Sequence, residues 1–211
     1  MADETRTIMT APAADPAPLG LGAFALTTFL LSAANAGWMT SASGNAWLGY
    51  AFAYGGLCQL LAGMWEFRNR NVFGATAFST YGGFWIGLGL WALLVAPAAG
   101  AKAGKDVAWI LLAFAIFNTY MLLWSTMVNA AVFGVFLTLE LTEIILFIGN
   151  FAANTNIVKI GGYVGVLTAL VAWYTSAAGV ANGTSGRIVL PVGQALWRPA
   201  AVVAAEPAAR A

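Results

Sequence analysis

The stretch that decides the fold runs from residue 129 to residue 150 and reads NAAVFGVFLTLELTEIILFIGN. Its charged members are Glu140 and Glu143, and the other residues are apolar or neutral. Its length is close to the roughly 20 apolar residues with which a helix crosses about 30 Å of hydrocarbon. We therefore expect a transmembrane helix here.

Five more runs of this kind follow from the same pattern, at residues 19–41, 46–67, 74–96, 106–127 and 157–179. A closed barrel would instead need many segments of about 10 residues in which apolar and polar side chains alternate, and the chain has no such alternation. Since lipid admits only helices and closed barrels, the sequence predicts an all-α integral membrane protein with six transmembrane helices. Residues 1–18 and 181–211 are interpreted as tails on either side of a membrane domain at 19–180, and the C-terminal tail has the composition of a disordered loop.

The composition supports a membrane environment and excludes several chemistries. Of the 211 residues, 61% are hydrophobic and 8% are charged, whereas about a quarter of an ordinary soluble chain is charged. There is no histidine and one cysteine, Cys58, which removes His/Cys metal sites, Ser/His triads and intrachain disulfides. A net charge of +1 gives no basic field for nucleic acid. We expect a protein that is not an enzyme, with no metal, no cofactor and no nucleic-acid partner.

The charges between the spans predict an orientation. With six spans both termini lie on one side, together with the arginines Arg6, Arg68, Arg70, Arg187, Arg198 and Arg210. The other side receives the lysines Lys102, Lys105 and Lys159. Because positive charge favours the cytoplasmic side, the sequence predicts a multi-pass protein of the cell membrane with both termini in the cytoplasm.

Polar residues at membrane depth are candidates for a path through the protein. The members we single out as lining such a path are Thr27, Thr28, Asn35, Gln59 and Asn150, and the same inventory holds Asn118 and Thr119. Neutral hydroxyls and amides can donate hydrogen bonds to a small anion without holding it permanently, which suits a pathway. The competing interpretation is that each of them bonds to a neighbouring helix.

Glu140 and Glu143 form the most unusual pair, because two carboxyls three residues apart share a face of one apolar helix. Two charges placed so close in hydrocarbon are unfavourable, so at least one should carry a proton near neutral pH. The pair is a candidate proton relay. The alternative is that a neutral carboxyl fastens one helix or one subunit to another.

Small residues at four-residue spacing occur in Gly83-Phe-Trp-Ile-Gly87 and in Gly161-Gly-Tyr-Val-Gly165. Such spacing lets helix backbones approach closely in lipid, so we expect a bundle packed through small residues. Faces of this kind are expected to hold the subunits of a homo-oligomer together.

A family resemblance begins at Asp15-Pro-Ala-Pro-Leu-Gly-Leu21, whose signature members are Asp15, Pro16, Pro18 and Gly20. The heptapeptide resembles the Asn-Pro-Ala-Pro-Leu-Gly-Leu signature of the acetate uptake transporter family, the succinate–acetate permeases. Further blocks agree in order and spacing: Thr27-Thr28, Asn35-Ala-Gly37, Gly63 to Glu66, Asn71 to Trp85, Ile148-Gly-Asn150 and Gly186 to Gly193. The resemblance covers residues 15 to 193.

The resemblance implies a homo-hexamer in the lipid bilayer, with a separate pathway for acetate and similar small carboxylates in each subunit. It also implies a hydrophobic constriction, carried here by Phe24, Tyr81 and Leu139. A neck of this kind slows passage by excluding water, and a tyrosine hydroxyl in it can donate to a carboxylate.

The chain departs from the family pattern at four positions. Asp15 replaces asparagine, Arg70 stands where glycine commonly precedes Asn71, and Glu140 and Glu143 lie in a helix expected to be apolar. Aspartate accepts hydrogen bonds from backbone N–H groups at a helix start as asparagine does, so the first departure should leave the helix start intact.

Three functions fit these features. The first is transport of acetate with a proton, or as the neutral acid, with the glutamates as relays. The second is a passive channel for acetate or another small solute, in which the glutamates are structural. The third is a membrane sensor or assembly protein that binds carboxylates without moving them, although the short loops leave no soluble domain to support it.

Overall fold

The computed structural model of the protein describes residues 13–39 and 45–198, and all of the secondary structure in these residues is helical. The elements in chain order are α1 (Ala17–Asn35), α2 (Trp47–Phe52), a π-helical segment (Ala53–Cys58), α3 (Gln59–Arg68), α4 (Val72–Leu94), α5 (Ala96–Ala99), a 3-10 turn (Gly100–Lys102), α6 (Ala103–Ser125), α7 (Ala130–Phe151) and α8 (Thr155–Ser185). The prediction of an all-α membrane protein is confirmed.

The six expected spans correspond to six helical stretches. By length and composition, five helices can cross a membrane: α1, α4, the stretch Ala96–Ser125, α7 and α8. The remaining span is residues 47–68, where α2, the π-helical segment and α3 follow one another without a break. The wide π turn contains Gly55, whose missing side chain leaves room for Thr27 on α1.

Two helix ends differ from the expected boundaries. Helix α1 ends at Asn35, before the expected residue 41, because the chain turns at Gly37 with a φ of 79°. Helix α8 continues to Ser185, beyond the expected residue 179, and ends at Gly186 with a φ of 65°. Glycine is the residue that adopts this left-handed conformation without strain.

Residues 187–198, which follow α8, make specific hydrogen bonds to the helices, which differs from the disordered tail expected for this segment. The Asn182 Oδ1 atom accepts hydrogen bonds from the Val189 and Leu190 N–H groups at 2.7 and 3.0 Å. Further on, the Leu196 N–H donates to the Thr126 carbonyl at 2.7 Å. This segment therefore lies across the turn between α6 and α7.

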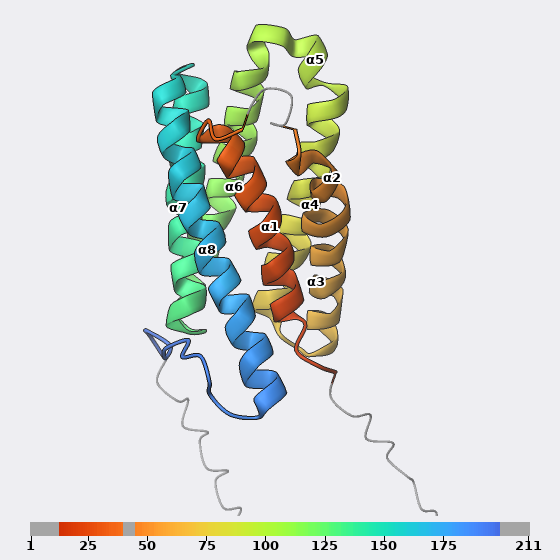
Figure 1. Ribbon diagram of the computed structural model, residues 1–211, viewed down its shortest axis with the longest axis vertical. Helices are drawn as coiled ribbons and strands as arrows, with labels where there is room; N and C mark the ends of the chain where they lie inside the picture. The colour runs from red at the N-terminus through yellow and green to blue at the C-terminus, as the bar shows by residue number, and fades with distance from the viewer. Residues whose placement is uncertain (1–12, 40–44, 199–211) are drawn as a thin grey trace, which may run out of the picture.

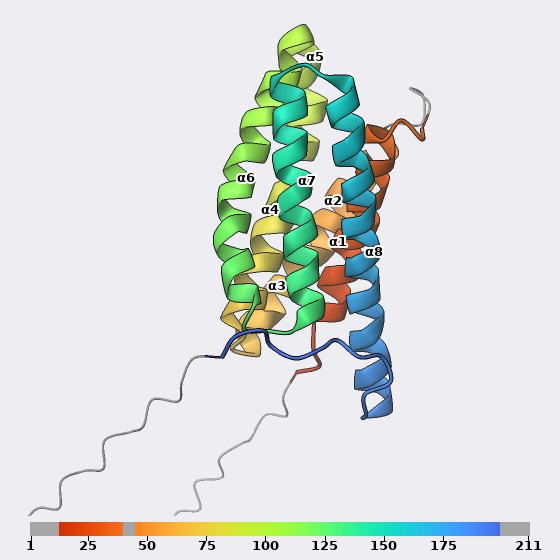
Figure 2. The same cartoon turned by 90° about the vertical axis from the view of Figure 1, so that its left-hand side faces the viewer.

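The helices form one upright bundle in which α1 lies between α8 on one side and α2–α3 on the other (Figure 1). Helix α8 also packs on α7, α7 on α6, and α3 on α4 (Figure 2). The two ends of the described chain, residues 13 and 198, lie at the same end of the bundle, and α5 lies at the opposite end. This agrees with an even number of spans.

One of the two glycine pairs lies inside the bundle and the other lies on its outer surface. Side chains at Gly161 and Gly165 would overlap Leu146 on α7 and Ser32 on α1, respectively. These glycines therefore pack helices within one chain, which corrects the expectation that they join subunits. A side-chain carbon added at Gly83 or Gly87 on α4 would meet nothing within 4 Å, so this pair lies on the outside of the bundle.

Much of the outer surface is apolar. Examples of large side chains on α6 and α8 that are about half exposed or more are Trp109, Ile116, Leu123, Leu167 and Leu170. An apolar surface this extensive is far larger than the patches tolerated in water, and it fits contact with lipid or with other subunits.

The turn between α3 and α4 contains a residue in a strained conformation. Arg70 has a φ of 59°, in the left-handed region that costs a non-glycine residue about 1 to 2 kcal/mol. This explains why glycine is common at this position in the family pattern. The next residue, Asn71, begins α4 by accepting a hydrogen bond from the Gly74 N–H at 3.1 Å.

Candidate functional site

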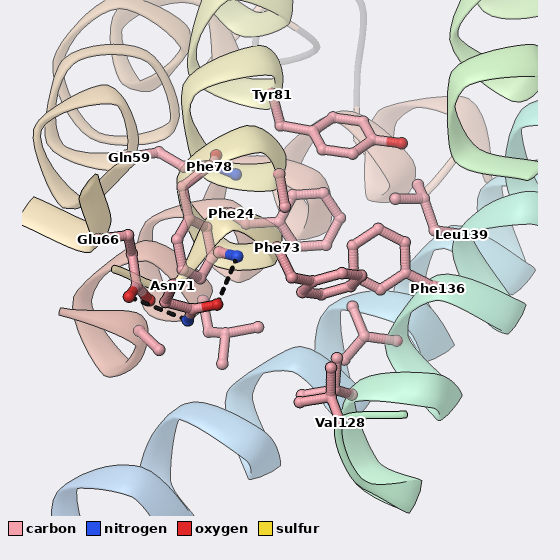
Figure 3. A pocket seen from close by; sticks show the side chains of 16 residues that line it. Phe24, Gln59, Glu66, Asn71, Phe73, Phe78, Tyr81, Val128, Phe136 and Leu139 are labelled. Atoms are coloured by element: carbon pink, nitrogen blue, oxygen red, sulfur yellow. Dashed lines mark hydrogen bonds between the residues drawn. The ribbon is translucent and has the colours of Figure 1, made fainter. Parts of the chain in front are cut away.

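Three cavities follow one another along the bundle. The proximal cavity, of about 90 Å³, lies at the end with the described termini and includes Gln59, Glu66 and Asn71 in its wall (Figure 3). The middle cavity, of about 40 Å³, includes Thr28 and Glu143. The distal cavity, of about 200 Å³, lies toward the end that carries α5. Since one water occupies about 10 to 15 Å³ of such space, each cavity can hold water or a small solute.

Phe24, Tyr81 and Leu139 lie between the first two of these cavities. All three line both the proximal and the middle cavity. They come from α1, α4 and α7, and their exposed fractions are 4%, 3% and 6%. The rings of Phe24 and Tyr81 meet edge to face with centroids 5.9 Å apart. The structure thus brings together the three residues that the family motif points to, and we call them the neck.

The middle and distal cavities share part of their walls. Both are lined by Leu31, Asn35, Phe84, Leu111 and Leu146. The three cavities and the neck therefore follow one another as neighbours from one end of the bundle toward the other.

Buried polar atoms without a protein partner gather along this series. Among the described residues, such side-chain atoms occur in Thr28, Gln59, Glu66, Ser79, Trp85, Trp91 and Glu143. All of these residues except Ser79 line one of the three cavities. A buried polar group without a partner is costly, so atoms of this kind mark surfaces made for water or a polar solute.

The expected pathway residues divide into two groups. Thr28, Asn35, Gln59 and Asn150 each line at least one cavity. Thr27 lines none of the three, because its hydroxyl donates to the Ala23 carbonyl at 3.1 Å within α1 and its side chain packs against the π-helical segment. For Thr27 the structure favours the interpretation of a packing residue.

The Tyr81 hydroxyl does not point into the proximal cavity (Figure 3). It lies 3.0 Å from Asn118 Oδ1 and 3.3 Å from Glu143 Oε1. Its hydrogen has two protein acceptors within reach, so the expectation that this hydroxyl donates to a carboxylate solute in the neck stays a prediction. The tyrosine contributes its ring to the neck.

The two glutamates of α7 have different surroundings. Glu143 is 2% exposed, lines the middle cavity and leaves its Oε2 atom without a protein partner. Glu140 is half-buried and lines none of the three cavities. Its carboxylate accepts hydrogen bonds from Asn118 Nδ2 at 2.7 Å and Thr119 Oγ1 at 2.8 Å, both on α6. The shared helical face therefore places one carboxyl at the path and the other at a contact between helices.

Glu66 and Asn71 are site residues that the sequence reasoning did not select. Glu66 is 1% exposed, and its Oε2 atom accepts a hydrogen bond from Asn71 Nδ2 at 3.0 Å (Figure 3). A charged residue so close to the end of an apolar run is expected to reach the membrane surface. The available signal was that Glu66 and Asn71 both belong to blocks of the family pattern.

The signature before the first span holds the start of α1 in place. Asp15 Oδ1 accepts a hydrogen bond from the Ala17 N–H at 2.9 Å, as expected for an aspartate at a helix start. Pro16 directly precedes α1, and the Pro18 carbonyl accepts a hydrogen bond from Ser176 Oγ on α8 at 2.6 Å. A side chain at Gly20 would overlap the ring of Phe78, a wall of the proximal cavity.

Membrane-spanning helices around cavities in series, with an apolar constriction between two of them, define a membrane transporter or channel. The model of the GPR1/FUN34/yaaH family matches residues 2–197, and the chain belongs to this family.

Relatives and a solved structure agree with this assignment. The chain is 40% identical to "Acetate permease A" of Emericella nidulans, over 88% of this chain and 68% of the permease. It is 35% identical to "Succinate-acetate/proton symporter SatP" of Escherichia coli K12, over 86% of this chain and 96% of that protein. The solved structure of "the bacterial acetate channel SatP" superposes with a TM-score of 0.80 at 34% identity, covering 86% of this chain and 99% of that one.

Proposed function

We propose that the protein moves acetate and related small carboxylates across a membrane, along the series of cavities and through the neck of Phe24, Tyr81 and Leu139. The observation that carries this proposal is that the neck residues line the cavity on each side of them, with unpartnered polar atoms in both cavities. The names of the two relatives, an acetate permease and a succinate–acetate/proton symporter, support the substrate class.

The neck selects by size and by polarity. Its aromatic and aliphatic side chains offer no free hydrogen-bond donor, so a solute has to shed water to enter it. A small carboxylic acid that carries its proton loses far less hydration than the corresponding anion. The neck therefore favours the passage of acetate together with a proton.

Glu143 is the proton site in this proposal. It is buried beside the neck, it lines the middle cavity, and its Oε2 atom has no protein partner. Glu140, the other relay candidate, is bound by two donors from α6 and has the role of an anchor. The alternative is a passive channel, and it is favoured by the solved relative, which is described as an acetate channel.

Reconstitution into liposomes separates the two mechanisms. Movement of one acetate with one proton reaches the same final distribution as diffusion of the neutral acid through lipid, so the rate of uptake is the quantity to compare. With equal acetate on both sides, an imposed pH gradient and the membrane potential held at zero, the parent protein should accumulate labelled acetate faster than protein-free liposomes do. Protein-dependent flux that follows an imposed membrane potential at equal pH would instead support the channel. No protein-dependent flux of acetate in either experiment would contradict the proposed function.

The subunits form a homo-hexamer in this proposal, with one pathway in each subunit. The hexamer rests on the family resemblance, and the outward-facing Gly83 and Gly87 on α4 supply a surface for close contact between helices. Native mass spectrometry should detect six subunits in mild detergent. Gly83→Leu should reduce that assembly, whereas Gly183→Leu, an exposed control beyond the packed part of α8, should not. A stable monomer in the parent would contradict the proposal.

In this proposal both termini lie on the cytoplasmic side of a cell membrane. Four arginines of the described chain lie at the end of the bundle that carries residues 13 and 198: Arg68, Arg70, Arg187 and Arg198. Three lysines lie at or near the other end: Lys102, Lys105 and Lys159. An N-terminal epitope should be digested in inside-out vesicles and protected in right-side-out vesicles, and the reverse pattern would invert the orientation.

A further inference from the structure

The Tyr81 hydroxyl has one hydrogen and two acceptors within reach. Asn118 Oδ1 lies at 3.0 Å and Glu143 Oε1 at 3.3 Å, and all three side chains are buried. A phenol donates one hydrogen bond. At any moment, therefore, either Asn118 or Glu143 receives the hydrogen.

The orientation of the Asn118 amide is fixed by its other contacts. Its Nδ2 atom donates to the Phe136 carbonyl at 3.0 Å and to Glu140 Oε2 at 2.7 Å, which uses both N–H groups. If the amide were turned over, its oxygen would face these two acceptors. Asn118 Oδ1 is thus held toward Tyr81 as a permanent acceptor, with Glu140 as its anchor.

The protonation state of Glu143 determines which of the two acceptors receives the hydrogen bond of the Tyr81 hydroxyl. When Glu143 carries a proton, it can donate to the Tyr81 oxygen, and Tyr81 donates to Asn118. When Glu143 is charged, the Tyr81 hydrogen turns toward it, and Asn118 Oδ1 loses its donor. The titratable groups that act on Glu143 are Glu140 on its own helix and Tyr81 on α4. The side chains of α1 in the middle cavity, Thr28 and Ser32 among them, are neutral.

We propose that Asn118 is a positioning residue that competes with Glu143 for the hydrogen of Tyr81, and so sets the pH at which Glu143 exchanges its proton with the middle cavity. In the exchange the O–H bond of Glu143 breaks and an O–H bond forms on a carboxylate oxygen of the solute, which leaves a charged Glu143 and an undissociated acid. The Tyr81 hydrogen stays on Tyr81 and only changes its acceptor. The transport readout of this inference rests on the proposed function.

Asn118→Leu removes the competing acceptor at nearly constant volume. Tyr81 then donates to Glu143 alone and stabilises its charged form, so the midpoint of acetate uptake against pH should move to lower pH by about one unit. Tyr81→Phe removes the donor and should move the midpoint to higher pH. Thr119→Val, which removes the other donor of Glu140 without touching Tyr81, should keep the parent midpoint.

The double variant decides whether Asn118 acts through Tyr81. In the Tyr81→Phe background, adding Asn118→Leu should leave the midpoint where Tyr81→Phe puts it. A shift by Asn118→Leu of the same size with and without Tyr81 would overturn the proposal, and so would a parent-like midpoint in Asn118→Leu. If Asn118→Leu does not assemble, a parent-like midpoint in Tyr81→Phe alone would overturn the proposal.

An infrared titration tests the hydrogen-bonded set of Asn118, Tyr81 and Glu143 without a transport measurement. The carbonyl band of protonated Glu143 in the purified protein is identified by its loss in Glu143→Gln. Its titration midpoint should shift to lower pH in Asn118→Leu and to higher pH in Tyr81→Phe, and should stay at the parent value in Thr119→Val. If liposomes show no acetate flux while the infrared midpoints shift as expected, the proposed function fails and the role of Asn118 stands. Unshifted infrared midpoints alongside normal acetate flux would overturn the role of Asn118 and leave the proposed function standing.

Discussion

The walls on the two sides of the neck carry the same chemical group in two different settings. Glu66 in the proximal cavity and Glu143 in the middle cavity are 1% and 2% exposed, and each has one bonded and one unpartnered oxygen. The partner of Glu66 is Asn71, which is fixed because it also caps α4. The partner of Glu143 is Tyr81, a neck residue whose hydroxyl also has Asn118 Oδ1 within hydrogen-bond distance. Therefore only the protonation state of Glu143 can change the hydrogen bonding of a neck residue.

The largest expected effect separates these two carboxyls directly. Glu143→Gln keeps the hydrogen-bonding shape but cannot titrate, so the protein-dependent part of acetate accumulation under a pH gradient should be lost while the folded protein remains. Glu66→Gln still offers Asn71 an acceptor and should retain accumulation. Uptake into liposomes measures both. A parent-like pH profile in Glu143→Gln would leave that residue as a fastener between helices and remove the distinction.

Leu139→Ala should weaken the barrier between the two cavities. Removing the buried side chain widens the neck, so uptake of butyrate relative to acetate should rise. The free energy of unfolding should fall by about 2 to 5 kcal/mol, because a cavity remains. Competition assays and denaturation in detergent measure the two quantities. An unchanged preference in a folded variant would place the selective barrier elsewhere.

Asn71→Ala tests the fixed partner on the proximal side. The change removes a helix cap, which is worth about 1 kcal/mol, and leaves a buried carboxyl oxygen of Glu66 without its donor, at about 1 to 3 kcal/mol. Tyr81→Phe on the other side should cost less, about 0.5 to 1.5 kcal/mol, because Glu143 can keep its proton when the hydroxyl is gone. Equal losses of stability in denaturation experiments would mean that the two partners are equally fixed.

Arg70→Gly is expected to have the smallest effect, and it should be stabilising. Glycine removes the strain of the left-handed conformation beside Asn71 at some cost in chain entropy, so the free energy of unfolding should rise by about 0.5 to 1 kcal/mol. The acetate uptake rate should not change, since Arg70 lines none of the three cavities. A loss of stability on the same denaturation assay would show that the arginine side chain contributes more than its backbone costs.

The helices could be predicted because the bilayer requires long apolar runs. The neck was predicted only through the family resemblance, and of its three residues Tyr81 alone lies within one of the matching blocks. The π-helical segment could not be predicted, since it depends on how Gly55 packs against Thr27. The same limit applies to the two glycine pairs, which have identical spacing and opposite positions in the fold.

Side-chain partners were also beyond the sequence. Spacing places Glu140 and Glu143 on one face, but a helical face is wide enough to contact α6 with one carboxyl and a cavity with the other. The Tyr81 hydroxyl points away from the proximal cavity, and Asn118, thirty-seven residues further along the chain, offers it an acceptor. Such pairings are set by the packing of distant helices.

Passage of acetate through the neck is the central claim, and closing the neck tests it most directly. Leu139→Trp places a larger side chain in the neck, whereas Leu141→Trp places it on the outer face of the same helix, where Leu141 is 47% exposed. In liposomes that contain equal amounts of folded protein, labelled acetate uptake should fall to the protein-free level for Leu139→Trp and stay at the parent level for Leu141→Trp. Parent-like uptake by folded Leu139→Trp would contradict the account.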